Sequence, residues 1–241
     1  MRTVEGGAIP LTKISSGGIG VMNEMAVHSA LKQLYYQPGD VFEAEVGPYL
    51  VDLAKPDRLV EIQSGGFYSI RGKLEALLEK YVVHLVYPVA AVKYIISLSP
   101  EDGSEIQRRR SPKRGTVYDV FGELVYIPTL LQHPNLRIEV VLIKEEELRC
   151  RDGKGSWRRN KASIVGRRLA EVVDRRMFAS PQDYLALLPD NLPCPFSNKD
   201  LATLLGLPLS RVRPITYTLR EAGFIQLAGK TGNLLLYKLL D

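Results

Sequence analysis

Apolar residues in the first hundred positions change from a helical to a strand period. From Ile19 to Tyr36 they recur every three or four residues, which predicts a helix that ends before Pro38 and Gly39. Period-two alternation follows, broken at residues 47–48 and 55–58 by turn-forming residues. The pattern predicts three short antiparallel strands, at Val41–Val46, Tyr49–Ala54 and Leu59–Gln63.

The helical period returns after Ser64-Gly65-Gly66 and predicts a second helix over Phe67–Lys80. Two strands, a helix, a strand and an Arg-rich helix are predicted next, at His84–Pro88, Lys93–Leu98, Val117–Leu131, Leu136–Ile143 and Val165–Met177. This order indicates an α/β fold in which helices flank one central mixed sheet.

The last sixty residues have a different pattern. A short helix is predicted at Pro181–Leu188, and Ser197 has the character of an N-cap for a helix that Gly206 ends. The remaining elements are two helices and a hairpin, at Asn198–Leu205, Pro208–Ala222, Ile225–Ala228 and Leu234–Leu239. Two helices joined by a tight turn and followed by a hairpin are typical of a winged helix-turn-helix.

The predicted recognition helix and wing carry side chains suited to phosphates and base edges. These are Arg211, Arg213, Tyr217, Arg220 and Lys230. Residues 181–241 hold six Lys/Arg against five Asp/Glu, a small surplus. The same module could therefore serve for docking a protein partner or for dimerisation, and the sequence leaves both uses open.

Composition places the chain among globular proteins, with 45% apolar and 24% charged residues in 241 positions. The longest apolar run is broken by His84, Pro88 and Lys93, so no bilayer span and no membrane partner are expected. Cys150 and Cys194 form no CxxC pair, which fits a reducing cytoplasm. No signal peptide is recognisable at the start of the sequence.

Positive charge is concentrated in the middle of the chain. Residues 101–180 hold seventeen Lys/Arg against twelve Asp/Glu, whereas residues 1–100 hold nine against ten. Clustered guanidinium groups attract phosphate, so DNA is the expected partner, with RNA as an alternative. The predicted nucleic-acid-binding residues there lie in two loops and are Arg108, Arg109, Arg110, Lys113, Arg114, Arg158 and Arg159.

Carboxylates form a row across the three predicted strands. With turns at residues 47–48 and 55–58, Asp52 lies directly opposite both Glu43 and Glu61. Side chains in such positions are only about 5 Å apart, so their like charges repel unless a cation lies between them. Hard oxygen ligands favour Mg²⁺ or Mn²⁺. Removing one carboxylate is therefore expected to keep or raise the melting temperature of the metal-free protein.

These residues resemble the PD-(D/E)xK, or restriction-endonuclease-like, nuclease superfamily. Glu24 on the first helix, Asp52 on a strand and Glu61-Ile62-Gln63 match its motif in order, over roughly residues 19–98. The resemblance implies that Asp52, Glu61 and the carbonyl of Ile62 bind the metal, and that Glu24 completes its shell. Glu24 also interrupts an apolar stripe, where a carboxylate needs a partner.

The third motif residue departs from the family, which usually has lysine where this chain has Gln63. Lys73 on the next helix is the expected substitute for the missing ammonium group. By resemblance, Gln63 or Lys73 would orient the attacking water or stabilise charge on the phosphate. An ordinary surface role for Lys73 stays open.

The sequence thus predicts a restriction-endonuclease-like core with a C-terminal winged-helix domain, acting as a metal-dependent DNA endonuclease in defence, repair or mobile-element machinery. The alternatives are an inactive nuclease fold acting as a DNA-binding regulator or structural subunit, and an RNA-processing factor. The expected divisions are a tail (1–18), the core (19–150), a basic linker and connecting helix (151–180) and the winged helix (181–241). The oligomeric state stays open, with a homodimer compatible with the sequence.

Overall fold

The computed structural model describes residues 25–240, which divide into two compact units. Unit 1 contains residues 25–64, 86–116 and 140–175, and unit 2 contains residues 65–85, 117–139 and 176–240. Three long strands, β4, β6 and β7, have residues in both units because the unit boundaries cut through them. The class is α/β, as the sequence predicts.

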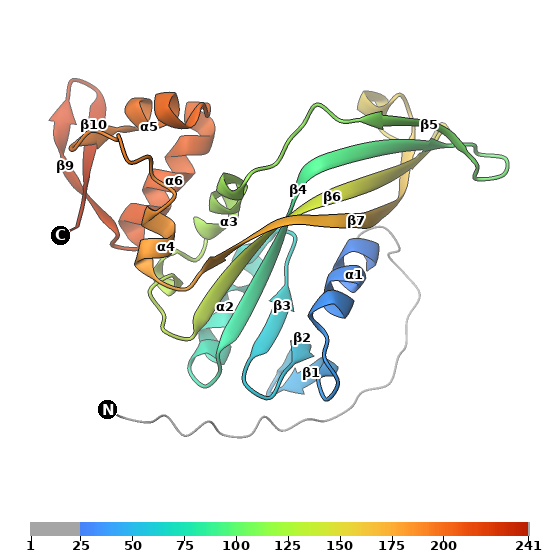
Figure 1. The fold of residues 1–241 in the computed structure, drawn as a ribbon, viewed down its shortest axis with the longest axis horizontal. Coiled ribbons are helices and arrows are strands. Elements are labelled where there is room, and N and C mark those ends of the chain that lie inside the picture. The colour runs from blue at the N-terminus through green and yellow to red at the C-terminus, as the bar shows by residue number, and fades with distance from the viewer. Residues whose placement is uncertain (1–24, 241) are drawn as a thin grey trace. The chain divides into compact units, whose positions relative to one another are not determined.

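Unit 1 is built on a seven-stranded sheet with the order β1-β2-β3-β4-β6-β7, in which β5 also pairs with β4 (Figure 1). The strands are β1 (Val41–Val46), β2 (Tyr49–Ala54), β3 (Leu59–Ile62), β4 (Val83–Leu98), β5 (Glu105–Arg110), β6 (Leu136–Cys150) and β7 (Ser163–Phe178). The predicted bounds of β1 and β2 are confirmed, and β3 ends one residue early. Gly47, with a φ of 59°, allows the tight β1–β2 turn.

The helix α1 (Met25–Tyr35) supplies the core of unit 1. Its Val27 and Leu31, one turn apart, pack with a cluster of buried residues from four strands: Leu53, Val60, Ile62, Val86, Val141 and Ile143. Leu34, on the next turn, is exposed, and Tyr35 packs against the cluster. Residues 19–24 of the predicted helix lie outside the described residues.

Four sequence predictions about the middle of the chain are wrong. Residues 165–177 form most of strand β7 rather than a helix, and the predicted basic loop at 108–110 is part of β5. The two predicted strands between 84 and 98 are one continuous strand, β4. Residues 117–131 form no long helix but three short turns, η1 (Val117–Val120), α3 (Phe121–Leu124) and η2 (Pro128–Leu130).

The physical reasons are visible in the sequence. Arg168, Ala170 and Glu171 are good helix formers, but β-branched neighbours such as Val172 and Val173 suit a strand that pairs with β6. Sheet pairing therefore overrides helix propensity in this segment. In residues 117–131 Pro128 lacks the N–H that a continuing helix requires.

Unit 2 contains the helices α2 (Phe67–Leu78), α4 (Pro181–Leu185), α5 (Asn198–Leu205) and α6 (Leu209–Glu221). It also holds a second sheet with the order β8-β10-β9, formed by β8 (Phe196–Ser197), β9 (Ile225–Thr231) and β10 (Leu234–Leu239). The predicted helices and hairpin of the last sixty residues are confirmed, although α4 is three residues shorter.

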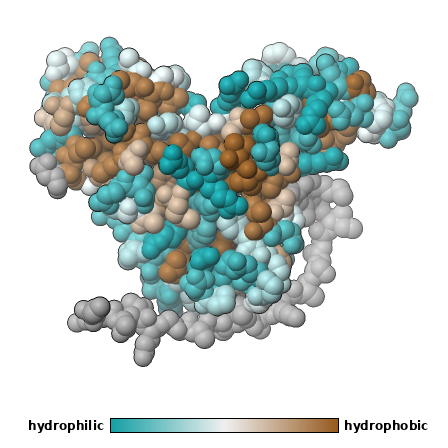
Figure 2. Space-filling model, viewed as in Figure 1, coloured by the Kyte–Doolittle hydropathy of each residue, from teal (hydrophilic) through white to brown (hydrophobic). Residues whose placement is uncertain are grey.

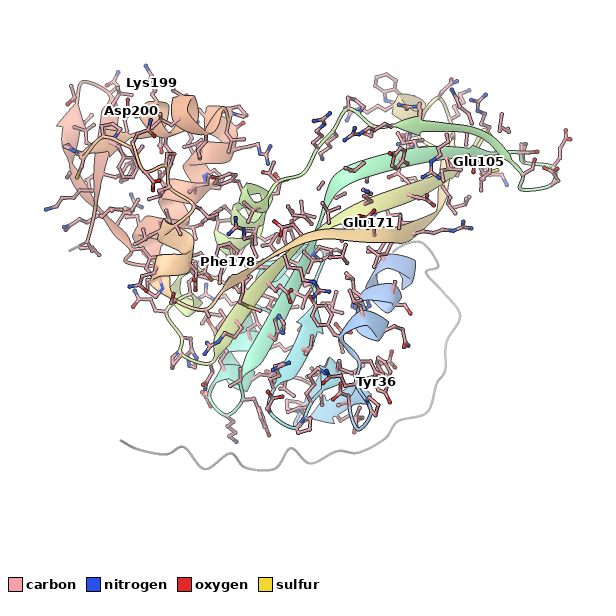
Figure 3. All side chains as sticks on the ribbon, in the orientation of Figure 1. Tyr36, Glu105, Glu171, Phe178, Lys199 and Asp200 are labelled. Carbon is pink, nitrogen blue, oxygen red and sulfur yellow. The ribbon has the colours of Figure 1, made fainter. Side chains whose placement is uncertain are left out.

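Local signals fix these short elements. Ser197 accepts hydrogen bonds from the N–H groups of Lys199 and Asp200, and the Asp200 carboxylate accepts from the Ser197 N–H, a reciprocal capping box at the start of α5 (Figure 3). Gly206 ends α5 in the left-handed conformation. Phe178 stacks on Tyr184 with ring centroids 4.8 Å apart, which anchors α4 to the end of β7.

Candidate active site and nucleic-acid interface

The carboxylate row lies on β1, β2 and β3 in the predicted register. Phe42 pairs with Leu53 and Ala44 with Val51, which places Glu43 opposite Asp52. Leu53 pairs with Val60, and continuing that register places Asp52 opposite Glu61. Glu43 also has a left-handed backbone, with a φ of 48°. That conformation costs a non-glycine residue about 1–2 kcal/mol, and such strain tends to occur at functional sites.

Two side chains of α1 contact the row, and one of them, Lys32, supplies a positive charge that the row requires. The Lys32 ammonium group lies 3.0 Å from Asp52 Oδ1 and 3.4 Å from Glu43 Oε1. His28 Nε2 lies 3.1 Å from Asp52 Oδ2 and 3.1 Å from the carbonyl oxygen of Ile62. Since a carbonyl oxygen only accepts, His28 Nε2 must carry the proton of this shared hydrogen bond.

Asp52 is held as a carboxylate by these contacts. Burial alone would raise its pKa, but the hydrogen bonds from His28 and from the Ile62 N–H (2.8 Å), with the charges of His28 and Lys32, outweigh it and lower the pKa below 3.8. Removing Asp52 therefore leaves two donors and a cation without their acceptor. These contacts reverse the expectation that its removal would relieve repulsion.

The other predicted site residues are only partly gathered here. Glu61 is buried, with 7% of its surface exposed, and Gln63 is half-buried, its N–H donating to the Val86 carbonyl of β4. Glu24 lies outside the described residues. Lys73 lies on α2 in unit 2, and its role stays a prediction.

His28 and Lys32 were not predicted as site residues, although their spacing is a signal. Glu24, His28 and Lys32 are spaced four residues apart, so a helix presents them on one face. In this segment the sequence singles out only Glu24, whereas the side chains that contact Asp52 are His28 and Lys32 of α1.

Two oxygen atoms of the site, Asp52 Oδ2 and the Ile62 carbonyl oxygen, are of the kind that divalent cations bind. Asp52 Oδ2 and the Ile62 carbonyl oxygen converge on one polarised N–H, so a cation could replace that hydrogen if the His28 ring turned away. The His28 side chain is 36% exposed, which leaves room for the movement. Among residues 25–240 no three His, Cys, Asp or Glu side chains cluster as a ready metal site, so a backbone carbonyl would have to complete the ligand set.

The two basic segments meet in unit 1. Arg108 of β5 pairs with Glu146 of β6 at 2.8 Å, and Arg151 reaches Gln107 of β5 at 3.5 Å. Arg109 and Arg110 are exposed, as are Lys113, Arg114 and the Arg158 of η3 (Trp157–Arg159). Figure 2 shows the region around β5 mostly in hydrophilic colours. The structure therefore brings together the two groups of arginines that the sequence keeps forty residues apart.

A second group of buried charges lies farther along the sheet of unit 1. Lys93 of β4 lies 2.7 Å from Glu145 Oε1 and 3.3 Å from Glu147 Oε2. Arg149 Nη2 lies 2.6 Å from Glu147 Oε1, and Arg167 of β7 lies 3.9 Å from both carboxylates. We call these five residues the β6 network. The pKa of Glu147 is lowered, because the hydrogen bond and charge of Arg149, with Lys93, outweigh burial.

Comparison with known proteins identifies a family for residues 25–179. A family model, "Domain of unknown function (DUF8091)", matches residues 25–179. This protein belongs to the DUF8091 family. A Treponema pallidum (strain Nichols) protein called "Uncharacterized protein" is 35% identical over 185 residues, which cover 76% of this chain and 73% of the relative. No solved structure gives a significant match.

The DUF8091 match contains the carboxylate row, the β6 network and both basic segments, whereas α5, α6 and the β9–β10 hairpin lie beyond it. On α6, Arg213 and Tyr217 are exposed, but Arg211 pairs with Asp119 and Arg220 with Glu221. Lys230 is exposed on β9. In residues 25–240, none of the helices has the length and apolar character required to span a bilayer.

Proposed function

We propose that this DUF8091 protein is a metal-dependent nuclease that hydrolyses phosphodiester bonds in DNA. The observation that carries the proposal is the convergence of Asp52 Oδ2 and the Ile62 carbonyl oxygen on a single position, now held by His28 Nε2–H. These are two of the three ligands that the restriction-endonuclease-like resemblance assigns to the metal. Glu61, the third, lies opposite Asp52 by register.

The order of elements supports the same proposal. A helix, a three-stranded meander, a second helix and a further strand follow one another as α1, β1, β2, β3, α2 and β4. The strands β3 and β4 are neighbours in the sheet, and the segment that joins them contains α2. We therefore interpret residues 25–98 as a restriction-endonuclease-like core.

The cation would be Mg²⁺ or Mn²⁺, held by Asp52, Glu61 and the Ile62 carbonyl, with Glu24 completing the shell by resemblance. When bound, such a cation lowers the pKa of a water and neutralises charge on the phosphate. Lys32, already beside Asp52, supplies an ammonium group that stabilises negative charge on a phosphate oxygen. Gln63 orients the attacking water through its amide.

We further propose that unit 2 carries a winged-helix module that binds DNA or a protein partner. Its elements β8, α5, α6, β9 and β10, with the sheet order β8-β10-β9, support this interpretation. Exposed Arg213, Tyr217 and Lys230 suit DNA, whereas exposed Leu227 and Leu239 on the hairpin suit a protein.

A cleavage assay tests the nuclease proposal. The full chain is incubated with labelled duplex, branched and single-stranded DNA and with RNA, in Mg²⁺, in Mn²⁺ and in EDTA. We expect cleavage of DNA that needs the cation and is absent from Asp52→Asn. Equal cleavage by both proteins, or none on any substrate, would overturn the proposal.

One observation favours a second function. Lys32 and His28 already pair with the Asp52 carboxylate, so its charge needs no metal ion to balance it. The same geometry therefore suits a DNA-binding protein with an inactive nuclease core. That protein would bind the substrates of the assay and cleave none of them. An RNA-processing role would appear as cleavage of RNA alone.

A further inference from the structure

Trp157 is the only tryptophan of the chain and has 80% of its surface exposed. It begins the short turn η3 in the loop between β6 and β7. An indole exposed to this extent offers a flat aromatic face on which a ligand can stack. The loop is therefore a place to look for a ligand.

The backbone of the loop around Trp157 is held by hydrogen bonds and close packing. The Gly155 N–H donates to the Lys161 carbonyl at 2.7 Å, and the Lys161 N–H donates to the Ser156 carbonyl at 3.0 Å. Asn160 and Lys161 both adopt the left-handed conformation, with φ of 51° and 58°. A side chain at Gly155 would clash with the Ala162 carbonyl. Hydrogen bonds and tight backbone packing, rather than a lack of structure, place Trp157 in solvent.

The charges of the loop that carries Trp157 are almost all positive. Arg158 lies over the indole, its guanidinium carbon 5.7 Å from the ring centroid. Asp152 is the single carboxylate between residues 151 and 162, against these basic residues: Arg151, Lys154, Arg158, Arg159 and Lys161. Through Arg151 and Gln107 the loop also contacts β5, with its exposed Arg109 and Arg110. An aromatic face surrounded by cations fits a phosphate chain that carries unpaired bases.

Other partners fit less well. Gly153, Gly155, Ser156 and Asn160 give the indole no apolar companions in the loop, so the apolar area is too small for insertion into a lipid surface. The centres of protein interfaces are poor in lysine, whereas this loop has two. Bases in a duplex are paired and stacked, and their faces cannot reach an indole.

We propose that Trp157 is a stacking platform for an unpaired base, and that the β6–β7 loop and β5 bind single-stranded nucleic acid or an unpaired nucleotide beside a duplex. The inference rests on the proposed function in taking nucleic acid as the ligand, and it deepens it by naming the class of substrate. The arginines supply affinity for the backbone, and the indole distinguishes unpaired from paired bases.

The test uses the fluorescence of Trp157, the chain's one indole, in the full protein. A mixed-sequence oligodeoxynucleotide of about 20 nucleotides, longer than a typical single-strand site, is titrated into the protein. The duplex of the same sequence is titrated in a parallel experiment. We expect the single strand to quench the fluorescence and the duplex to leave it unchanged. The anisotropy of the labelled oligonucleotide then measures the affinity of variants: Trp157→Ala should weaken single-strand binding about tenfold or more, and Trp157→Tyr should restore most of it.

Tyr68→Ala is the matched control, because Tyr68 is an exposed aromatic residue (74%) on α2, and it should leave affinity unchanged. Binding of the single strand without quenching, or equal quenching by the duplex, overturns the stacking proposal and leaves the nuclease proposal intact. A response to anionic lipid vesicles instead of oligonucleotides also overturns it. If no nucleic acid binds at all, both proposals fall.

Discussion

The carboxylate row and the β6 network are two groups of charged residues on one sheet, and they differ in what surrounds them. In both, carboxylates lie about 3 Å from cationic side chains. The row, however, contacts the half-exposed His28 of α1, and its Glu43 borders a pocket of about 240 Å³ lined by His28, Ser29, Lys32, Gln33, Phe42 and Glu43. In the network Glu147 is only 4% exposed and is held by Lys93 and Arg149.

Buried ion pairs alone therefore do not mark a functional site. Networks of this kind also occur where they only support the fold, and they are costly to break without being needed for chemistry. What separates the row is a neighbouring pocket lined by Glu43, His28 and Lys32, and a backbone carbonyl that shares its hydrogen-bond donor with a carboxylate. Each variant of the row accordingly has a matched control in the network.

The largest expected contrast is in catalysis. Asp52→Asn should lower the rate of cleavage at least about 100-fold, because the loss of a residue that only supports a metal ligand already costs about 10–100-fold. Glu147→Gln should leave the rate per folded molecule within about twofold. The measurement is initial rate at saturating Mg²⁺, corrected for the folded fraction. A similar loss in both variants would show that the two groups do not differ in function.

The next contrast is in stability. Glu147→Gln breaks a pair whose carboxylate is buried and should lower the free energy of unfolding by about 2–3 kcal/mol, since Lys93 and Arg149 lose their charged acceptor. Asp52→Ala should lower it by about 1–3 kcal/mol, because the Ile62 N–H, His28 and Lys32 lose an acceptor. Urea unfolding in EDTA measures both. An unchanged or higher urea midpoint for Asp52→Ala would instead support the expectation from the sequence, that repulsion between the carboxylates dominates.

The β6 network should also affect how the free energy of unfolding changes at acid pH. The pKa of Glu147 is lower in the folded protein than its ordinary value of 4.5, so its contribution is fully present above that value and is lost as the pH falls through the folded pKa. We expect the free energy of unfolding of the native protein to fall more steeply below about pH 4.5 than that of Glu147→Gln. Parallel pH profiles for the two proteins would contradict the ion-pair geometry.

The sequence predicted the register of β1, β2 and β3 well for a local reason. Turns at 47–48 and 55–58 join β1, β2 and β3 directly, so the register follows from turn length and alternation. The order of the C-terminal elements was equally accessible, because Ser197 and Gly206 mark the ends of α5.

The rest depends on interactions between distant segments. The identity of β7 as a strand is decided by pairing with β6, which no window of residues 163–178 contains. The proximity of Arg151 to Gln107 depends on the order of β4, β5 and β6 in the sheet. His28 and Lys32 were accessible in principle from their spacing, but the position of α1 over Asp52 was needed to show what they do.

The salt dependence of nucleic-acid affinity tests which arginines of β5 bind phosphate. Arg109 and Arg110 are exposed on β5, whereas Arg108 pairs with Glu146 and lies over the Tyr94 ring. Replacing Arg109 and Arg110 by Ala should reduce the slope of log affinity against log salt by nearly one unit for each phosphate that the variant no longer neutralises. Arg108→Ala should change it less. Anisotropy titrations at several salt concentrations measure the slopes. An unchanged slope in every variant would show that β5 is solvated surface that does not bind nucleic acid.

The smallest effect is expected at the third motif position, where it decides which group replaces the family's lysine. Gln63→Lys should retain the cleavage rate or raise it a few-fold, because an ammonium group there adds charge stabilisation in the transition state. Lys73→Ala should lower the rate only if Lys73 has taken over that role, whereas Lys32→Ala should lower it if the ammonium beside Asp52 does so. The three variants are compared by single-turnover rates in Mg²⁺, with Lys80→Ala, an exposed lysine, as control. If Gln63→Lys abolishes cleavage while Lys73→Ala and Lys32→Ala leave it unchanged, Gln63 itself performs a step that an ammonium group cannot, and the resemblance fails at its third motif residue.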